Sequence, residues 1–127
     1  MPMKRIVVAE DDPASAELMT DFLMAHNYEV TLARDGADAV RKIEQVSPDL
    51  ILLDIQLPIL DGFGVLRWLK TQPRLADIPV AALTAYAMRD DREHILSAGF
   101  NAHISKPIDT ALLPSQLEAL IDRLPQG

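Results

Sequence analysis

The stretch of sequence that decides the fold is Leu50-Ile51-Leu52-Leu53, which ends at the carboxylate of Asp54. A continuous apolar run of this length, preceded by the helix-breaking pair Pro48-Asp49, is typical of a strand that is buried on both faces. Strands of that kind occur in parallel sheets, because the crossover connections place helices on both sides of the sheet. We therefore expect this run to belong to a parallel sheet with both faces covered.

Outward from this run, strand-like and helix-like segments alternate along the whole chain. Strands are expected at residues 5–9, 28–32, 50–53, 80–83 and 102–104. Helices are expected from Pro13 to Ala25, from Gly36 to Val46, from Asp61 to before Pro73, from Met88 to Gly99, and from Leu113 to Leu124. This alternation predicts an α/β fold, a doubly wound five-stranded parallel sheet with five helices. No linker is visible, so one domain is expected over residues 1–127.

The spacing of apolar residues also predicts which face of each helix is buried. The expected faces are Ala14, Leu18, Phe22 and Ala25 in the first helix, and Met88, Ile95 and Leu96 in the fourth. Asp61 is expected to cap the third helix, because an aspartate side chain can accept hydrogen bonds from the free N–H groups of a first turn.

Composition excludes several classes of function. The 127 residues contain no cysteine, which removes disulfides, thiolate zinc sites and cysteine nucleophiles. The net charge is −7, and residues 1–63 hold 12 acidic and 5 basic side chains, so binding to a nucleic-acid backbone is not expected. No apolar stretch is long enough for a membrane helix, and the first residues do not form a cleavable signal. We expect a cytoplasmic protein that binds neither nucleic acid nor membrane.

Polar groups follow four of the five expected strands. Glu10-Asp11-Asp12 follows the first strand, Asp54 the third, Thr84 the fourth and Lys106 the fifth. Ligands of such sheets bind outside the carboxyl ends of the strands, so these groups are expected to meet. Clustered carboxylates favour a hard cation such as Mg²⁺, and an ammonium beside a hydroxyl favours a phosphoryl group. The pattern predicts an aspartate that accepts phosphate.

Each of these groups could also have an ordinary structural role. The three acids can stabilise the start of a helix, and an aspartate after a strand can form a turn. Thr84 suits a strand end, and Lys106 alone could be a surface lysine. The phosphate interpretation depends on all four strand ends together.

Four segments together carry a resemblance to a known family. They are Val8-Ala9-Glu10-Asp11-Asp12, Leu53-Asp54-Ile55-Gln56-Leu57-Pro58 with Asp61-Gly62, Leu83-Thr84-Ala85, and Ser105-Lys106-Pro107-Ile108. Over its full length the chain resembles the receiver domains of two-component signalling, the response-regulator family. The resemblance implies the flavodoxin-like strand order 2-1-3-4-5.

The resemblance also implies a phosphorylation site and a metal site. Asp54 matches the phosphoacceptor and, with Asp11, a direct ligand of Mg²⁺, for which Mn²⁺ could substitute. The backbone carbonyl of Gln56 matches a third protein ligand, and Glu10 is expected to assist through water. The donor would be a sensor histidine kinase or a histidine phosphotransfer protein, and the output would be a contact with a downstream protein.

The resemblance assigns roles on the phosphoryl side as well. Thr84 and Lys106 match the pair that contacts phosphoryl oxygens, and the Lys106-Pro107 bond is expected to be cis. His103 stands where many receivers have Tyr or Phe, so Thr84 and His103 form the expected switch. Gln56 and Tyr86 flank the path of a hydrolytic water and are expected to set the lifetime of the phosphoryl group.

Three functional alternatives remain beside a stand-alone receiver that is a phosphoacceptor and no enzyme. The compact ends favour a stand-alone protein, but the chain could be a receiver segment of a hybrid kinase or of a longer regulator. A phosphohydrolase with an aspartyl-phosphate intermediate is disfavoured, because Gln56 stands where such enzymes commonly have a second acid and no glycine-rich phosphate loop is present. An interaction domain that has lost phosphorylation is disfavoured by the complete set of site residues.

Overall fold

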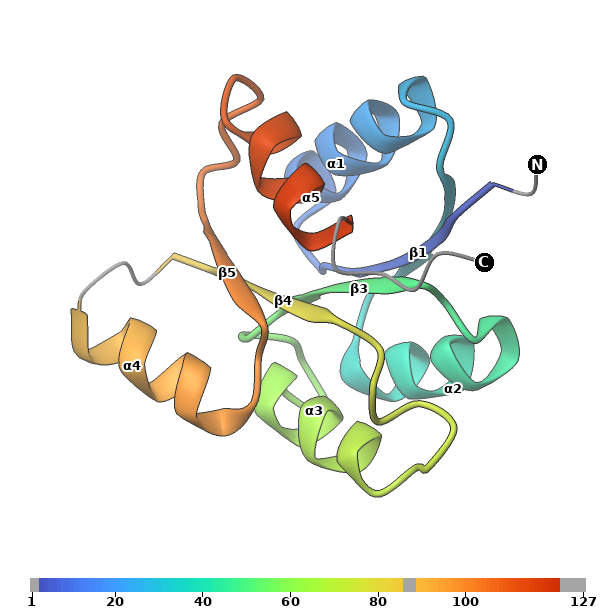
Figure 1. Cartoon of the computed structure of the whole chain (residues 1–127), viewed down its shortest axis with the longest axis vertical. Coiled ribbons are helices and arrows are strands. Elements are labelled where there is room, and N and C mark those ends of the chain that lie inside the picture. Colours follow the sequence, from blue (N-terminus) through green and yellow to red (C-terminus); the bar gives the residue numbers. More distant parts are fainter. Residues whose placement is uncertain (1–2, 86–88, 122–127) are drawn as a thin grey trace.

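The computed structural model describes residues 3–85 and 89–121, which form alternating strands and helices (Figure 1). The strands are β1 (Arg5–Ala9), β2 (Glu29–Ala33), β3 (Leu50–Asp54), β4 (Val80–Thr84) and β5 (Ala102–Ser105). The helices are α1 (Pro13–Ala25), α2 (Gly36–Val46), α3 (Gly62–Lys70), α4 (Arg89–Ala98) and α5 (Leu113–Ile121). Every expected element is present, and most bounds agree within two residues of those read from the sequence.

The five strands form one parallel sheet in the order β2-β1-β3-β4-β5. This order confirms the doubly wound, flavodoxin-like fold. The register aligns the strand ends, because Ala9 pairs with Leu53, Asp54 with Leu83, and Thr84 with Ser105. The residues that end β1, β3, β4 and β5 therefore lie along one edge of the sheet.

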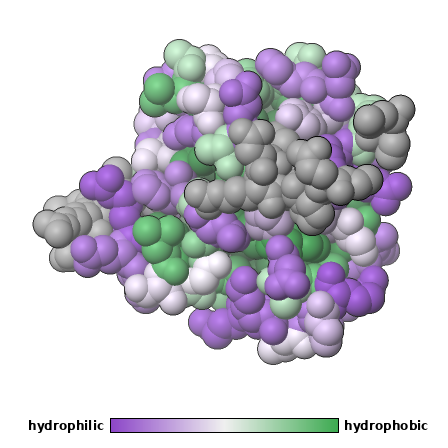
Figure 2. All heavy atoms as spheres, viewed as in Figure 1, coloured by the Kyte–Doolittle hydropathy of each residue, from purple (hydrophilic) through white to green (hydrophobic). Residues whose placement is uncertain are grey.

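Helices cover both faces of this sheet, with α1 and α5 on one side and α2, α3 and α4 on the other (Figure 1). Strand β3, which contains the apolar run 50–53, contributes side chains to the hydrophobic cores on both faces of the sheet. Ile51 and Leu53 of β3 lie in the cluster with α2 and α3, whereas Leu50 and Leu52 lie in the cluster with α1 and α5. An unbroken apolar run is required here because each face of the strand meets its own core. The face of the molecule drawn in Figure 2 is mainly hydrophilic, with hydrophobic residues in separate patches.

The expected buried face of α1 was mostly wrong, since only Phe22 of its four residues is partly buried and packs against the core. The buried residues of α1 are Ala16, Met19 and Leu23, whereas Leu18 is 39% exposed and Ala14 and Ala25 are exposed. Apolar side chains occur on nearly every side of this helix, so periodicity alone does not select a face. The packing of Met19 and Leu23 against the α5 side of the sheet decides it.

The expected face of α4 was only partly right. Ile95 is buried, but Leu96 is 52% exposed, and Met88 lies outside the described residues. The helix begins at Arg89 and ends at Ala98, where Gly99 adopts a φ of +115°. That positive φ terminates the helix as expected of a glycine.

Helix caps position the loops beside the strand ends. Asp12, Asp35 and Asp61 cap α1, α2 and α3, and each side chain accepts a hydrogen bond from a backbone N–H of the first turn. The expected role of Asp61 is thus confirmed, with Gly64 N donating at 2.8 Å. None of the helices in the described part of the chain is both long enough and apolar enough to span a membrane.

Candidate phosphoacceptor site

The carboxyl edge of the sheet buries three polar side chains. Glu10, Asp54 and Thr84 are at most 3% exposed, although each directly ends or follows a strand of the hydrophobic core. Isolated charges are costly in such surroundings and need partners. The partner of both carboxylates comes from the end of β5.

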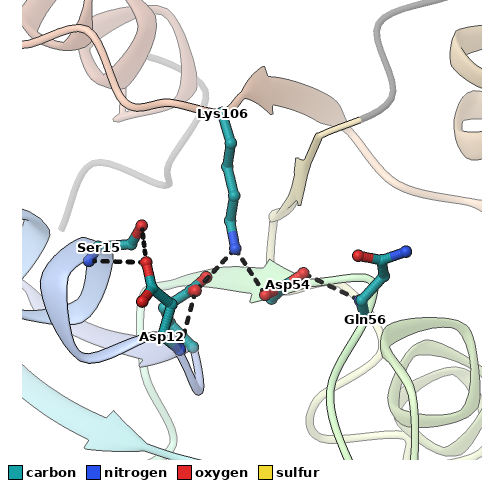
Figure 3. A network of polar contacts seen from close by, with 6 residues as sticks. Asp12, Ser15, Asp54, Gln56 and Lys106 are labelled. Atoms are coloured by element: carbon teal, nitrogen blue, oxygen red, sulfur yellow. Dashed lines mark hydrogen bonds and ion pairs between the residues drawn. The ribbon is translucent and has the colours of Figure 1, made fainter.

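Lys106 connects the two buried carboxylates. Its Nζ donates to Glu10 Oε1 and to Asp54 Oδ2, each at 2.7 Å, and Figure 3 shows the side chain pointing toward Asp54. The lysine side chain is itself only 18% exposed. Burial lowers the pKa of Lys106, but its hydrogen bonds to Asp54 and Glu10 outweigh burial, so the pKa is raised overall. The ammonium therefore stays charged between residues that are 96 and 52 positions away in the sequence.

Three carboxylates surround a position that suits a divalent cation. Glu10, Asp11 and Asp54 each offer one oxygen, and these oxygens lie within 4.8 Å of one another. Glu10 Oε2 is buried and accepts no hydrogen bond from any described residue. Burial raises the pKa of Glu10 to about 7, a change that the hydrogen bond from Lys106 opposes and the charge of Asp54 reinforces. A buried oxygen without a donor, beside two more carboxylates, fits the oxygen ligands that Mg²⁺ prefers.

The loop after β3 fixes the second oxygen of Asp54. Gln56 N donates to Asp54 Oδ1 at 2.9 Å, while Lys106 holds Oδ2 (Figure 3). The loop then returns to the strand end, since Gly62 N donates to Ile55 O at 2.9 Å. A Cβ at position 62 would lie 2.6 Å from Asp54 O, so the close return requires glycine. The carboxylate of Asp54 is thus held at a defined orientation.

Asp12 lies beside the site but serves the fold. Its Oδ2 accepts hydrogen bonds from the hydroxyl of Ser15 at 2.8 Å and from Ser15 N at 3.3 Å, and these bonds lower the pKa of Asp12. Its own N–H donates to Glu10 Oε1 at 3.2 Å. Asp12 therefore caps α1 and helps to orient Glu10.

Thr84 ends β4 and His103 lies in β5, the two strands that follow β3 in the order of the sheet. Thr84 O accepts a hydrogen bond from Lys106 N at 2.8 Å, so the end of β4 and the loop after β5 are joined directly. His103 is half-buried, and burial lowers its pKa, with Arg92 adding a smaller repulsion. It lines a cavity of about 200 Å³ between β5 and α5, together with Gln116 and Leu120.

Two expectations about this edge have different outcomes. The Lys106-Pro107 peptide bond is cis, as the resemblance implied. Tyr86 lies outside the described residues, so its role stays a prediction. Sequence reasoning placed Lys106 beside a phosphoryl group and missed its direct ion pairs with Glu10 and Asp54. No short motif signals those pairs, because only the sheet brings the three residues together.

Comparison with known proteins identifies the family. A family model of the response regulator receiver domain matches residues 6–118. The chain belongs to this family. A similar receiver protein is the polar-differentiation response regulator DivK of Brucella anthropi, which is 43% identical over 105 residues that cover 83% of this chain and 85% of that protein.

Receiver domains of histidine kinases are similar in structure. The receiver domain of the sensor histidine kinase PA1611 from Pseudomonas aeruginosa PAO1 is 37% identical, with a TM-score of 0.86 over 95% of this chain and 99% of that one. That structure contains a magnesium ion coordinated in its active site cleft. The receiver domain of a signal transduction histidine kinase from Syntrophus aciditrophicus is 34% identical, with a TM-score of 0.86 over 98% and 94% of the two chains.

Proposed function

We propose that this receiver domain accepts a phosphoryl group on Asp54 in a Mg²⁺-dependent reaction, and that a sensor histidine kinase or a histidine phosphotransfer protein is the donor. The observation that carries this proposal is the buried Lys106 ammonium, which lies 2.7 Å from the Asp54 carboxylate at the carboxyl edge of the sheet. A cation held there can pair with a transferring phosphoryl group as readily as with the free carboxylate.

The transfer is a displacement at phosphorus. A carboxylate oxygen of Asp54 attacks, the P–N bond to the donor histidine breaks, and its electron pair remains on the imidazole nitrogen. The new P–O bond makes an acyl phosphate. Lys106 Nζ and the Thr84 hydroxyl contact the phosphoryl oxygens, and the Gln56 N–H keeps the carboxylate oriented.

The metal would be held by residues of the acidic edge. Asp11, Asp54 and the backbone carbonyl of Gln56 are the proposed ligands, and Glu10 assists through water; the cluster of carboxylate oxygens and the unpartnered Glu10 Oε2 support this set. When bound, Mg²⁺ or Mn²⁺ would neutralise negative charge as the phosphoryl group transfers. It would also relieve the repulsion among the three carboxylates.

The output is a phosphorylation-dependent contact with a downstream protein. We place the switch at Thr84 and His103, because Thr84 ends the strand beside Asp54 and His103 lies on the next strand, where it lines a cavity next to α5. The lifetime of the signal is set by Gln56 and Tyr86. The protein acts as a phosphoacceptor, not as an independent enzyme, in the cytoplasm and without binding to nucleic acid or membrane.

The extent of the natural protein separates two versions of this function. A stand-alone regulator, with residues 1–127 as one receiver domain, is supported by the DivK relative, of which the match covers 85%. A receiver segment of a hybrid kinase is supported by the two histidine-kinase receivers, which are 37% and 34% identical. The reading frame of the gene distinguishes these two versions.

Phosphorylation by a small donor tests the proposal. The protein is incubated with acetyl phosphate and Mg²⁺, and intact mass is measured for wild type, Asp54→Asn and Asp49→Asn. Asp49 lies at the opposite end of β3, where its carboxylate accepts a hydrogen bond from Arg5 N, so it controls for loss of an acid. Wild type and Asp49→Asn should gain one phosphoryl group and Asp54→Asn none. A phosphorylated Asp54→Asn protein would remove Asp54 from its role.

A further inference from the structure

The loop that follows Asp54 contains an unusual turn. Leu60 N donates to Pro58 O at 2.8 Å, and the residue between them, Ile59, has a φ of +72°. These features define a γ-turn with positive φ, which is a rare and strained turn. A β-branched residue is a clear outlier at positive φ, a backbone conformation that glycine or asparagine adopts at a lower energetic cost.

The turn is held in place by the start of α2. Pro58 O also accepts a hydrogen bond from Gly36 N at 3.1 Å, which ties the turn to the start of α2. A Cβ at position 36 would lie only 1.7 Å from Leu60 O, so the loop packs closely against this glycine. The conformation of Ile59 is therefore imposed by its surroundings and is defined before any partner binds.

Burial does not explain why isoleucine occupies this position. Leu57 is buried and Leu60 is half-buried against the core, but the Ile59 side chain is 81% exposed. It is the most exposed of the large apolar side chains in the part of the chain that the structure describes. Strain at an exposed position, without a packing gain, points to a function of the side chain outside the fold.

The position of the loop relates Ile59 to the phosphoacceptor. Both ends of the loop meet at Asp54, since Gly62 N bonds to Ile55 O and position 62 touches Asp54 O. Ile59 lies three positions before Gly62, a span of at most about 11 Å. A protein that covers about 800 Å² of this surface occupies a disc with a radius of roughly 16 Å. A protein donor centred on Asp54 would therefore cover Ile59.

We propose that Ile59 is a docking residue for the protein that donates the phosphoryl group, and that it contacts an apolar side chain of that donor. This inference rests on the proposed function at Asp54. Ile59 takes no part in the chemistry and acts by positioning the donor. Because the turn fixes the direction of the side chain, little conformational freedom is lost on binding.

A comparison of two donors tests the proposal. Purified histidine kinases and phosphotransfer proteins of the host are autophosphorylated with labelled ATP, and the fastest donor to wild type is used beside acetyl phosphate. For Ile59→Asn, the ratio of the protein-donor rate to the acetyl-phosphate rate should fall at least five-fold, through a higher KM for the donor. The matched control is Met24→Gln, an exposed apolar residue in the last turn of α1 at the opposite edge of the sheet. Its ratio should equal that of wild type.

Thermal unfolding separates a docking role of Ile59 from a folding defect. Ile59→Asn should unfold at the same temperature as wild type or higher, because asparagine tolerates positive φ, so a folding defect cannot produce the expected ratio. An unchanged ratio, or an equal fall in Met24→Gln, would overturn the inference. So would an unchanged ratio together with weaker binding to a downstream target. If wild type accepts phosphate from neither donor, the proposed function itself fails.

Discussion

At the scale of single residues, Glu10 carries the clearest electrostatic signature. Its carboxyl group is fully buried, and burial raises its pKa from 4.5 to about 7, against the hydrogen bond from Lys106. A folded-state pKa above the unfolded value means that the folded protein binds this proton more tightly. The resulting stability is fully present below pH 4.5 and is lost as the pH rises through 7.

This linkage gives a prediction for the metal-free protein. In EDTA, Glu10→Gln should match wild type near pH 5 and become more stable relative to it toward pH 8, by about 1–3 kcal/mol. The glutamine is neutral at every pH and keeps the shape of the side chain. Urea unfolding at pH 5, 6, 7 and 8 measures the difference between the two proteins. A difference that does not change with pH would contradict the shifted pKa.

Asp11 tests the metal site by a different route. Asp11→Asn removes one of the three clustered carboxylates, so it should raise the melting temperature in EDTA. Mg²⁺ should then stabilise wild type by mass action and the variant much less. Thermal unfolding over a series of Mg²⁺ concentrations measures both effects. Equal stabilisation of the two proteins would argue against a metal ligand at Asp11.

At the scale of elements, α1 shows where a packed helix differs from its sequence pattern. Leu18 and Leu23 are both leucines of α1, but Leu23 is fully buried and Leu18 is 39% exposed. Leu23→Ala should destabilise the protein by about 2–5 kcal/mol, because it leaves a cavity in the core. Leu18→Ala should cost less than about 1 kcal/mol. Chemical denaturation of both variants measures the contrast, and equal losses would contradict the observed face.

The elements α4 and β5 carry the proposed switch. If a phosphoryl group at Asp54 draws Thr84 inward, His103 can move into the space that Thr84 leaves. That movement would change the cavity beside α5, because His103 lines it. Beryllofluoride with Mg²⁺ should therefore alter amide exchange in β5 and α4, while α2, which packs beside β1 and β2 at the other end of the strand order, stays unchanged. Hydrogen–deuterium exchange of wild type and Asp54→Asn measures this response. Identical exchange in α4 and β5 with and without the mimic would contradict the switch.

At the scale of the whole molecule, the fold was largely predictable, because the local spacing of apolar residues distinguishes its strands from its helices. The run at residues 50–53 and the other four strands alternate with helices, and such a repeat has few solutions. The carboxyl-edge site was predictable for the same reason, since parallel strands bring Glu10, Asp54 and Lys106 to one edge. The exposure of Leu18 was not, because which side of an apolar helix packs depends on the neighbouring elements.

Two features of the site lay beyond the sequence. The ion pairs of Lys106 join residues from three strands, and their existence depends on the burial that only the packed sheet provides. The positive φ of Ile59 contradicts the preference of isoleucine, so no turn signal marks it. The γ-turn arises because the loop must return to Asp54 while it packs against Gly36.

The central claim is that the end of β3 carries a phosphoryl group on one defined residue, Asp54. Reductive trapping tests it directly: the protein is phosphorylated with acetyl phosphate and Mg²⁺, treated with borohydride, and sequenced by tandem mass spectrometry. An acyl phosphate at Asp54 is reduced to an alcohol, so homoserine should appear at position 54 and at no other aspartate. Homoserine at Asp11 or Asp12, or a phosphoryl group that survives reduction on another residue, would contradict the account.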